Sequence, residues 1–246
     1  MKKGIILELA VPVRHEPSDR AEMVNQLLYG EEYEVLEKRE NWIRIKTIHD
    51  SYEGWIDIKQ HSENRIESLE GAYCDSYVTL RHIQRGALNL TPGSFLPSEE
   101  ILRELNFEIV ENDQAPKDLR ESCMLFLNAP YLWGGRTPYG IDCSGFTQLV
   151  FRLLGVYTPR DASEQLELGE QISFVEESRE GDLAFFDNPE GRITHVGIIL
   201  EEGGAKEIIH ASGRVRIDKL DHNGIYNEDT QSYSHKFRTI KRILQL

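Results

Sequence analysis

The stretch YGIDCSGFTQLVFRLLG, residues 139–155, decides the fold of the second half of this chain. Its apolar residues recur three or four positions apart, which is the period of one face of an α-helix: Phe146, Leu149, Val150, Leu153 and Leu154. Gly155 stands where a helix commonly ends. Cys143 lies three residues before Phe146, on the same apolar stripe and in the first turn. The pattern therefore predicts an amphipathic helix that begins near a cysteine.

Two interpretations of Cys143 follow from that position. Free cysteine is among the most buried residue types, so the thiol can simply be part of the core. Alternatively, the unpaired N–H groups of the helix N-terminus stabilise a thiolate, which makes Cys143 a nucleophile. The second interpretation needs a base within reach of the sulfur.

Three runs after the helix have the character of short strands in a covered sheet: residues 181–186, 193–200 and 207–212. His195 and His210 lie on the second and third of these runs. If the two strands are antiparallel neighbours, the imidazoles lie side by side, with His195 facing the thiol and His210 fixing its tautomer. Gly197 would leave open space beside His195. A helix followed by a meander of strands predicts an α+β fold.

A single histidine is more commonly an ordinary interior or edge residue than a catalytic one. For His195 and His210 that alternative stays open until they are considered together with Cys143. The other histidines lie in turn-like or charged contexts and are expected to have no catalytic role: His15, His49, His61, His82, His222 and His235.

Residues 1–66 contain alternating runs separated by turn-like clusters, which predicts a small β-barrel: residues 10–14, 31–39, 41–48 and 53–59. In the third run Ile43 and Ile45 share one face and are expected to point inward. Residues 67–112 are either a degenerate second barrel or an elaborated linker. Within them, residues 76–83 resemble a strand and residues 98–105 a short helix capped by Ser98.

Composition restricts the possible partners. The 246 residues carry a formal net charge of −14, which argues against sequence-independent binding to nucleic acid or to anionic membranes. No run of about 18 apolar residues and no signal peptide is evident, so we expect a cytoplasmic protein with no membrane partner, and a monomer. The three cysteines show no CxxC spacing, so we expect free thiols, no metal site and no cofactor.

Five segments together resemble the NlpC/P60 family of papain-like cysteine peptidases over residues 113–246: YLWGGRTPYGIDCSGFTQLVFRLLGV, PRDASEQ, GDLAFFD, THVGIIL and IIHASG. The N-terminal runs resemble a bacterial SH3 domain. The order of the two resembles the γ-D-glutamyl-L-diamino acid endopeptidases. The resemblance implies one or two SH3-like β-barrels followed by a papain-like domain with helices packed on an antiparallel sheet. It also implies that Cys143 is the nucleophile, His195 the base and His210 the orienting third member.

The resemblance implies further roles within the peptidase domain. Tyr131 corresponds to a tyrosine whose hydroxyl helps to hold the oxyanion. Asp142 and Ser144 would contribute to binding D-glutamate, although Asp142 can also cap the helix. Arg160 and Asp161 would line the cleft, with Asp161 binding the free amine of an N-terminal L-alanine. Family members often have serine after this aspartate, whereas this chain has Ala162.

Two residues outside the peptidase domain complete the implied site. Tyr52, just before GW, corresponds to a tyrosine that closes the far end of the cleft in relatives that require a free L-alanine. Glu22 is the acidic residue expected to assist it, since an offset of two residues in a strand preserves the face.

The implied activity is hydrolysis of the bond between γ-D-glutamate and meso-diaminopimelate or L-lysine in stem peptides with a free N-terminal L-alanine. We expect this in muropeptide recycling, with the muropeptide as the partner. The alternatives are a periplasmic hydrolase of intact peptidoglycan, an amidase or acyltransferase of the wider papain-like set, and a catalytically silent wall-binding protein.

Overall fold

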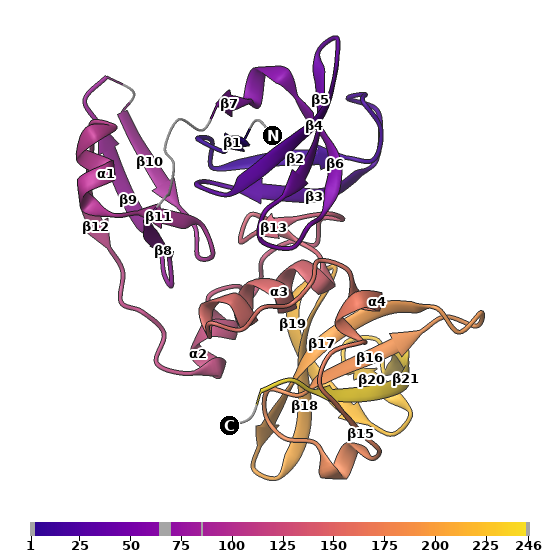
Figure 1. Ribbon diagram of the computed structural model, residues 1–246. Coiled ribbons are helices and arrows are strands. Elements are labelled where there is room, and N and C mark those ends of the chain that lie inside the picture. Colours follow the sequence, from indigo (N-terminus) through magenta and orange to yellow (C-terminus); the bar gives the residue numbers. More distant parts are fainter. Residues whose placement is uncertain (1–2, 64–69, 85, 245–246) are drawn as a thin grey trace. The chain divides into compact units, whose positions relative to one another are not determined.

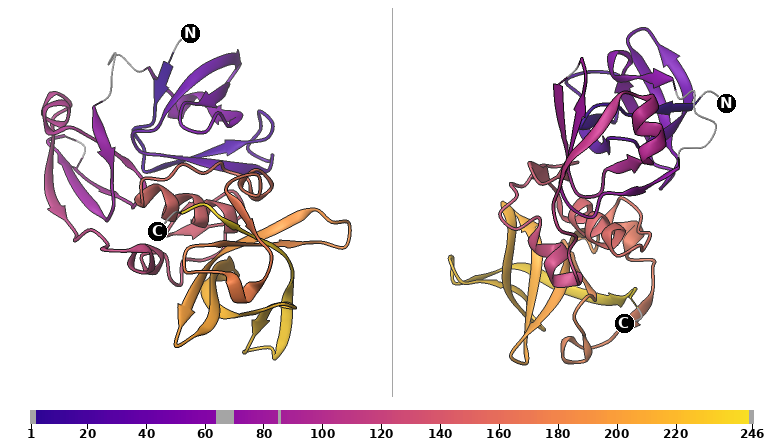
Figure 2. Two further views of the ribbon diagram at one scale, coloured as in Figure 1. Left: turned by 60° about the horizontal axis from the view of Figure 1, so that its bottom comes forward. Right: turned by 90° about the vertical axis from the view of Figure 1, so that its left-hand side faces the viewer.

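The computed structural model describes residues 3–63, 70–84 and 86–244 and divides the chain into two compact units (Figures 1 and 2). Unit 1 contains residues 1–117 and 133–137, and unit 2 contains residues 118–132 and 138–246. The predicted domain boundary between residues 66 and 67 lies outside the described residues. Among the described residues, no helix has the length and apolar character needed to span a bilayer.

Unit 1 begins with a seven-stranded sheet in the order β3-β2-β6-β5-β4-β1-β7. Its strands are β1 (Lys3–Ile5), β2 (Ala10–Arg14), β3 (Met23–Leu28), β4 (Glu32–Arg39), β5 (Trp42–Thr47), β6 (Glu53–Asp57) and β7 (Ser62–Glu63), with a 3-10 turn η1 (Ile58–Gln60). Ile43 and Ile45 are fully buried and Arg44 between them is exposed, so the predicted alternation is confirmed. The inward residues form one apolar cluster that includes Val11, Val13 and Ile56.

Residues 71–112 form a small sheet assembly beside this barrel within unit 1 (Figure 1). The elements are β8 (Gly71–Tyr73), β9 (Val78–His82), β10 (Gly86–Leu90), β11 (Phe95–Pro97), α1 (Glu99–Glu104) and β12 (Phe107–Asn112). The hydroxyl of Ser98 accepts the N–H of Ile101, so the predicted capped helix is confirmed. Leu80, Leu90 and Leu102 share a core with Tyr29 of the barrel.

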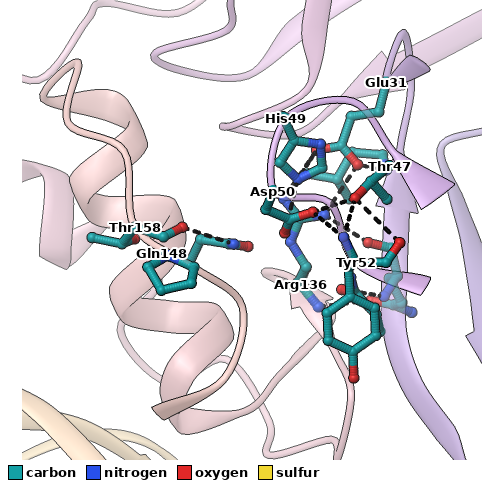
Figure 3. A network of polar contacts seen from close by, with 12 residues as sticks. Glu31, Thr47, His49, Asp50, Tyr52, Arg136, Gln148 and Thr158 are labelled. Atoms are coloured by element: carbon teal, nitrogen blue, oxygen red, sulfur yellow. Dashed lines mark hydrogen bonds and ion pairs between the residues drawn. The ribbon is translucent and has the colours of Figure 1, made fainter. Parts of the chain in front are cut away.

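The segment Trp133–Thr137 belongs to unit 1, where Arg136 fixes it to the barrel (Figure 3). The Arg136 guanidinium donates to Glu31 Oε1 and Oε2 at 2.9 and 3.0 Å, and to the carbonyl of Gln26 at 2.7 Å. The side chains of Arg136 and Glu31 are 0% and 1% exposed. A guanidinium buried to this degree requires its charge partner, because an unpaired buried charge is costly.

Unit 2 contains a second seven-stranded sheet in the order β15-β21-β16-β17-β18-β19-β20, with an added pairing of β20 to β21 that curls six of the strands into a closed sheet. The strands are β15 (Glu170–Ile172), β16 (Leu183–Asp187), β17 (Ile193–Glu202), β18 (Ala205–Ser212), β19 (Arg214–Asp221), β20 (Gly224–Asn227) and β21 (Ser232–Arg242). Their pairings are antiparallel.

The helices of unit 2 are α2 (Leu119–Met124), α3 (Cys143–Leu153) and α4 (Ala162–Gln165), with a 3-10 turn η2 (Val175–Glu177). The short strands β13 (Arg136–Thr137) and β14 (Gly140–Ile141) precede α3. Helix α3 packs against β17 and β18. It ends before Gly155, whose φ of +73° suits glycine. The predicted α+β arrangement, with helices packed on an antiparallel sheet, is confirmed.

Candidate active site

Cys143 is the first residue of α3 and is 6% exposed. Burial of the thiol, followed by the nearby Asp142 carboxylate, raises the pKa of Cys143 to about 12, although the backbone N–H of Val196 favours the thiolate. The sulfur therefore lies near the backbone N–H of Val196, the residue that follows His195 on β17. Burial and Asp142 outweigh the effect of the helix N-terminus, which one of the two interpretations of Cys143 invoked to stabilise a thiolate. The resting group at neutral pH is a thiol.

His195 and His210 lie on the neighbouring antiparallel strands β17 and β18. His195 Nε2 is 2.8 Å from His210 Nδ1, and the side chains are buried. The predicted pairing of the two imidazoles is confirmed. The space beside Gly197 is filled rather than open, since a Cβ at that position would lie 2.8 Å from the Cβ of His210. Glycine is needed there because any larger residue would displace the His210 side chain.

Both imidazoles are neutral at neutral pH. Burial, followed by the proximity of His210 and His235, holds the pKa of His195 well below its usual range. Burial also lowers the pKa of His210, against the opposing effect of Asp218. A neutral imidazole beside a neutral thiol is the arrangement in which the imidazole accepts the thiol proton as the sulfur attacks.

Sequence reasoning missed two residues that lie beyond His210. His210 Nε2 lies 2.9 Å from Oδ2 of Asp218, and Arg216 donates to Oδ1 of the same carboxylate at 2.7 Å. Asp218 and Arg216 both lie on β19, where Arg216 is the cross-strand partner of His210. Only the strand register reveals this, since residues eight positions apart on separate strands show no spacing motif.

His235 is a third residue that sequence reasoning missed. It lies on β21, and its ring stacks on that of His195 with 4.1 Å between centroids and 22° between planes. Burial lowers the pKa of His235 to about 4. The expected turn-like or charged context of His235 was wrong, because the residue lies on a strand and its ring packs on that of His195, whereas the expected lack of a catalytic role stays a prediction.

Nitrogen atoms of the three histidines lie within 4.8 Å of one another, so together they are a candidate metal cluster. Their orientation does not favour a metal as they stand. A metal lies in the plane of each imidazole that binds it, whereas the His195 and His235 rings are stacked nearly parallel. The facing nitrogens of His195 and His210 are already joined by a hydrogen bond. This geometry fits proton transfer better than metal binding.

Tyr131 is half-buried near the thiol. Burial, followed by the proximity of Cys143 and Asp142, raises the pKa of Tyr131 to about 12. The phenol is therefore protonated at neutral pH and can donate a hydrogen bond. Its place suits the expected oxyanion donor, and that role stays a prediction.

Asp142, Ser144 and Arg160 form one buried cluster at the start of α3. Arg160 donates to Asp142 Oδ2 at 2.5 Å and to the Ser144 hydroxyl at 2.8 Å. Asp142 also caps the helix, since its Oδ1 accepts the N–H of Gly145 at 2.7 Å. The structure thus brings these three predicted residues together. Asp161 lies half-buried just before α4, where Ala162 is the first helical residue.

Tyr52 and Glu22 lie in unit 1. Tyr52 precedes β6 and is half-buried, with its backbone N–H donating to the Thr47 hydroxyl at 2.7 Å (Figure 3). The Tyr52 hydroxyl is 3.5 Å from the carbonyl of Val24, two residues after the exposed Glu22. The Tyr52 hydroxyl therefore lies beside β3, the strand that begins just after Glu22. Their expected action on the peptide substrate stays a prediction.

Comparison with known proteins agrees with this description. Residues 128–234 match the NlpC/P60 family, and residues 13–60 match the bacterial dipeptidyl-peptidase SH3 domain. A protein of Bacillus cereus named γ-D-glutamyl-L-lysine dipeptidyl-peptidase is 26% identical over 82% of this chain and 72% of its own length. Dipeptidyl-peptidase 6 of Lysinibacillus sphaericus is 24% identical over 92% of this chain and 95% of its own length.

A shorter sequence match and a match to a solved structure agree with these assignments. A Bacillus subtilis protein, also named γ-D-glutamyl-L-lysine dipeptidyl-peptidase, is 40% identical over 37% of this chain and 30% of its own length. The crystal structure of an NlpC/P60 family protein from Bacillus cereus has a TM-score of 0.79 at 21% identity, covering 98% of this chain and 99% of that one. The chain therefore contains a bacterial dipeptidyl-peptidase SH3 domain at residues 13–60 and an NlpC/P60 domain at residues 128–234.

Proposed function

We propose that this protein is a cysteine peptidase that hydrolyses the bond between γ-D-glutamate and the diamino acid of peptidoglycan stem peptides. The observation that carries the proposal is the buried Cys143 thiol near the backbone N–H of Val196 on β17, the strand on which the preceding residue, His195, pairs with His210. The names of the similar proteins support a peptidase acting on peptidoglycan-derived peptides.

In this reaction the sulfur of Cys143 attacks the γ-carbonyl carbon of D-glutamate while His195 takes the thiol proton. The Tyr131 hydroxyl donates to the oxyanion of the tetrahedral intermediate. His195 then gives its proton to the nitrogen of the diamino acid, which leaves as an amine. Water, deprotonated by His195, hydrolyses the thioester and returns the thiol.

We further propose that the substrate carries a free N-terminal L-alanine. Asp161 and Glu22 would bind its ammonium group, and Tyr52 would complete the hydrogen bonding. Charge-assisted bonds of this kind contribute about 1.5–3 kcal/mol each, and an acylated nitrogen loses the charge. Such peptides arise once the stem has been released from muramic acid, so the proposed setting is recycling of released muropeptides in the cytoplasm.

The decisive experiment compares L-Ala-γ-D-Glu-diaminopimelate with its N-acetylated copy and with the L-lysine peptide, with mass detection of L-Ala-D-Glu. We expect cleavage of the free peptides and little of the acetylated one. Cys143→Ala should remain folded and inactive, because a methyl group is not a nucleophile. Activity of Cys143→Ala close to the wild-type value would overturn the thiol mechanism.

The role of Tyr52 needs its own comparison. Tyr52→Ala should lower kcat/KM for the free peptide by about tenfold or more, because one hydrogen bond to the ammonium group is lost. Tyr73→Ala, which removes a 40% exposed tyrosine of the same unit, is the matched control and should change kcat/KM little. Digestion of intact sacculi as readily as the free tripeptide would rule out selection for a free amine.

A further inference from the structure

Asp218 ends a buried chain of hydrogen bonds that starts at His195. His210 is the middle member, with Nδ1 2.8 Å from His195 Nε2 and Nε2 2.9 Å from Asp218 Oδ2. His195, His210 and Asp218 are 5%, 0% and 6% exposed. Because they are buried, each proton in the chain is held by a protein acceptor rather than exchanged among water molecules.

His210 alone cannot decide which nitrogen of His195 carries the proton. A neutral imidazole has one donor and one acceptor nitrogen, so two opposite directions of the chain are possible. In one direction His195 Nε2 donates to His210, which leaves His195 Nδ1 unprotonated. In the other direction His210 Nδ1 donates to His195, which places the His195 proton on Nδ1 and leaves no base for Cys143.

The carboxylate removes this ambiguity because it can only accept. Asp218 is ionised: burial raises its pKa, but the hydrogen bonds from His210 and Arg216 outweigh burial and lower it. His210 Nε2 must therefore carry the proton, so His210 Nδ1 must accept, and His195 Nε2 must donate. The Asp218 carboxylate, two hydrogen bonds away from His195, therefore sets the position of the proton on both imidazoles.

We propose that Asp218 is a positioning residue whose carboxylate, acting through His210, holds the proton of His195 on Nε2 and leaves Nδ1 to accept the proton of Cys143. The proposal rests on the proposed function, since the base is needed only if Cys143 attacks a peptide. Arg216 has the supporting task of holding the carboxylate in place, with its Nη2 2.7 Å from Oδ1 and 3.1 Å from Asp229.

Asp218→Asn is the informative substitution because Arg216 dictates how the new amide turns. Arg216 is only a donor, so it would hold the amide oxygen and direct the amide N–H₂ group toward His210 Nε2. That reverses the direction of both hydrogen bonds and moves the His195 proton to Nδ1. A wrong tautomer of this kind costs about 10⁴ in kcat in Ser-His-Asp peptidases. Because Asp218 acts through an additional imidazole, we expect a loss of at least about 100-fold in kcat, with KM nearly unchanged.

The matched control is Asp182→Asn. Asp182 is 2% exposed and pairs with Arg242 at 2.8 and 2.9 Å just before β16, so it tests the general effect of removing a buried carboxylate that binds arginine. Two readouts need no peptide substrate. The first is the tautomer of His195 by ¹⁵N NMR of the imidazoles, with His195→Gln to assign its signals. The second is the rate at which iodoacetamide alkylates Cys143.

We expect the wild type and Asp182→Asn to carry the His195 proton on Nε2, and Asp218→Asn to carry it on Nδ1 and to alkylate Cys143 at least about tenfold more slowly. A wild-type proton on Nδ1, or an unchanged tautomer with full activity in Asp218→Asn, would overturn the proposal. If Asp218→Asn does not fold, the ¹⁵N spectrum of the wild type still tests whether His195 carries its proton on Nε2. A wild type with the expected tautomer but no cleavage of any stem peptide would refute the proposed function and leave the tautomer assignment standing.

Discussion

The buried pair of Asp142 and Arg160 allows a quantitative test of what holds the start of α3. Asp142→Ala removes the helix cap, worth about 1 kcal/mol, and removes the carboxylate that the 2% exposed Arg160 binds at 2.5 Å, which costs about 3–5 kcal/mol. The free energy of unfolding should therefore fall by about 4–6 kcal/mol. Domains are commonly stable by only about 5–15 kcal/mol, so unit 2 becomes marginal in this variant.

The double variant Asp142→Asn with Arg160→Met should recover much of that loss. Asparagine still caps the helix and methionine fills the space of the arginine stem without a charge. We expect a coupling energy of about 3 kcal/mol between the two positions, from the cycle that includes the single variants Asp142→Asn and Arg160→Met. The exposed pair of Glu99 and Arg103 has a similar N–O distance of 2.7 Å but is 73–74% exposed, so the same double-mutant cycle there should give less than about 1 kcal/mol.

The assay should report on unit 2 alone. The three tryptophans, Trp42, Trp55 and Trp133, all belong to unit 1, so their fluorescence is unsuitable. Alkylation of Cys123, which is fully buried on α2, measures the opening of unit 2, and Cys74 is an internal reference in unit 1. A loss of about 4 kcal/mol should speed labelling of Cys123 by about 10³. A coupling energy below about 1 kcal/mol would refute the argument that burial makes this pair strong.

Three further predictions follow from the described contacts. Burial lowers the pKa of His235 to about 4 from about 6.5, so the unfolded chain binds more protons than the folded one between these pH values, and stability is lost as pH falls through this window. His235→Phe should reduce this pH dependence of the free energy of unfolding by about 1–3 kcal/mol, measured by urea unfolding at several pH values. An equal pH dependence in the variant and the wild type would contradict the lowered pKa. EDTA should leave peptide cleavage unchanged, because the stacked rings of His195 and His235 do not favour a metal. Loss of activity in EDTA that zinc restores would exclude the thiol mechanism. Glu31→Gln should lower the free energy of unfolding of unit 1 by about 3–5 kcal/mol, because Arg136 loses a fully buried partner; tryptophan fluorescence follows the unfolding. Glu53→Gln, in the exposed pair with Arg44, is the control and should cost less than about 1 kcal/mol. Equal effects of the two substitutions would show that burial does not govern the strength of these ion pairs.

The sequence by itself predicted helix α3, the barrel strands and the position of Cys143 at the start of that helix. The 3.6-residue period through Phe146 and Leu149 predicts α3, and the alternation around Ile43 and Ile45 predicts a barrel strand. These patterns are local, because a helix or strand with one buried face must repeat its apolar residues at its own period. The two histidines on successive strands could be paired for the same reason, since antiparallel neighbours are the usual arrangement of short consecutive strands.

Tertiary structure alone decided the surroundings of those residues. Asp218 and Arg216 meet His210 only through the register of β18 and β19, and His235 reaches His195 only because the sheet curls to bring β21 back. The protonation state of Cys143 could not be predicted from the sequence either. A helix N-terminus favours the thiolate, but burial and the Asp142 carboxylate keep the thiol protonated. Register, closure of a sheet and burial are sums over contacts between residues distant in the chain. No local period encodes them, so they exist only once the chain has folded.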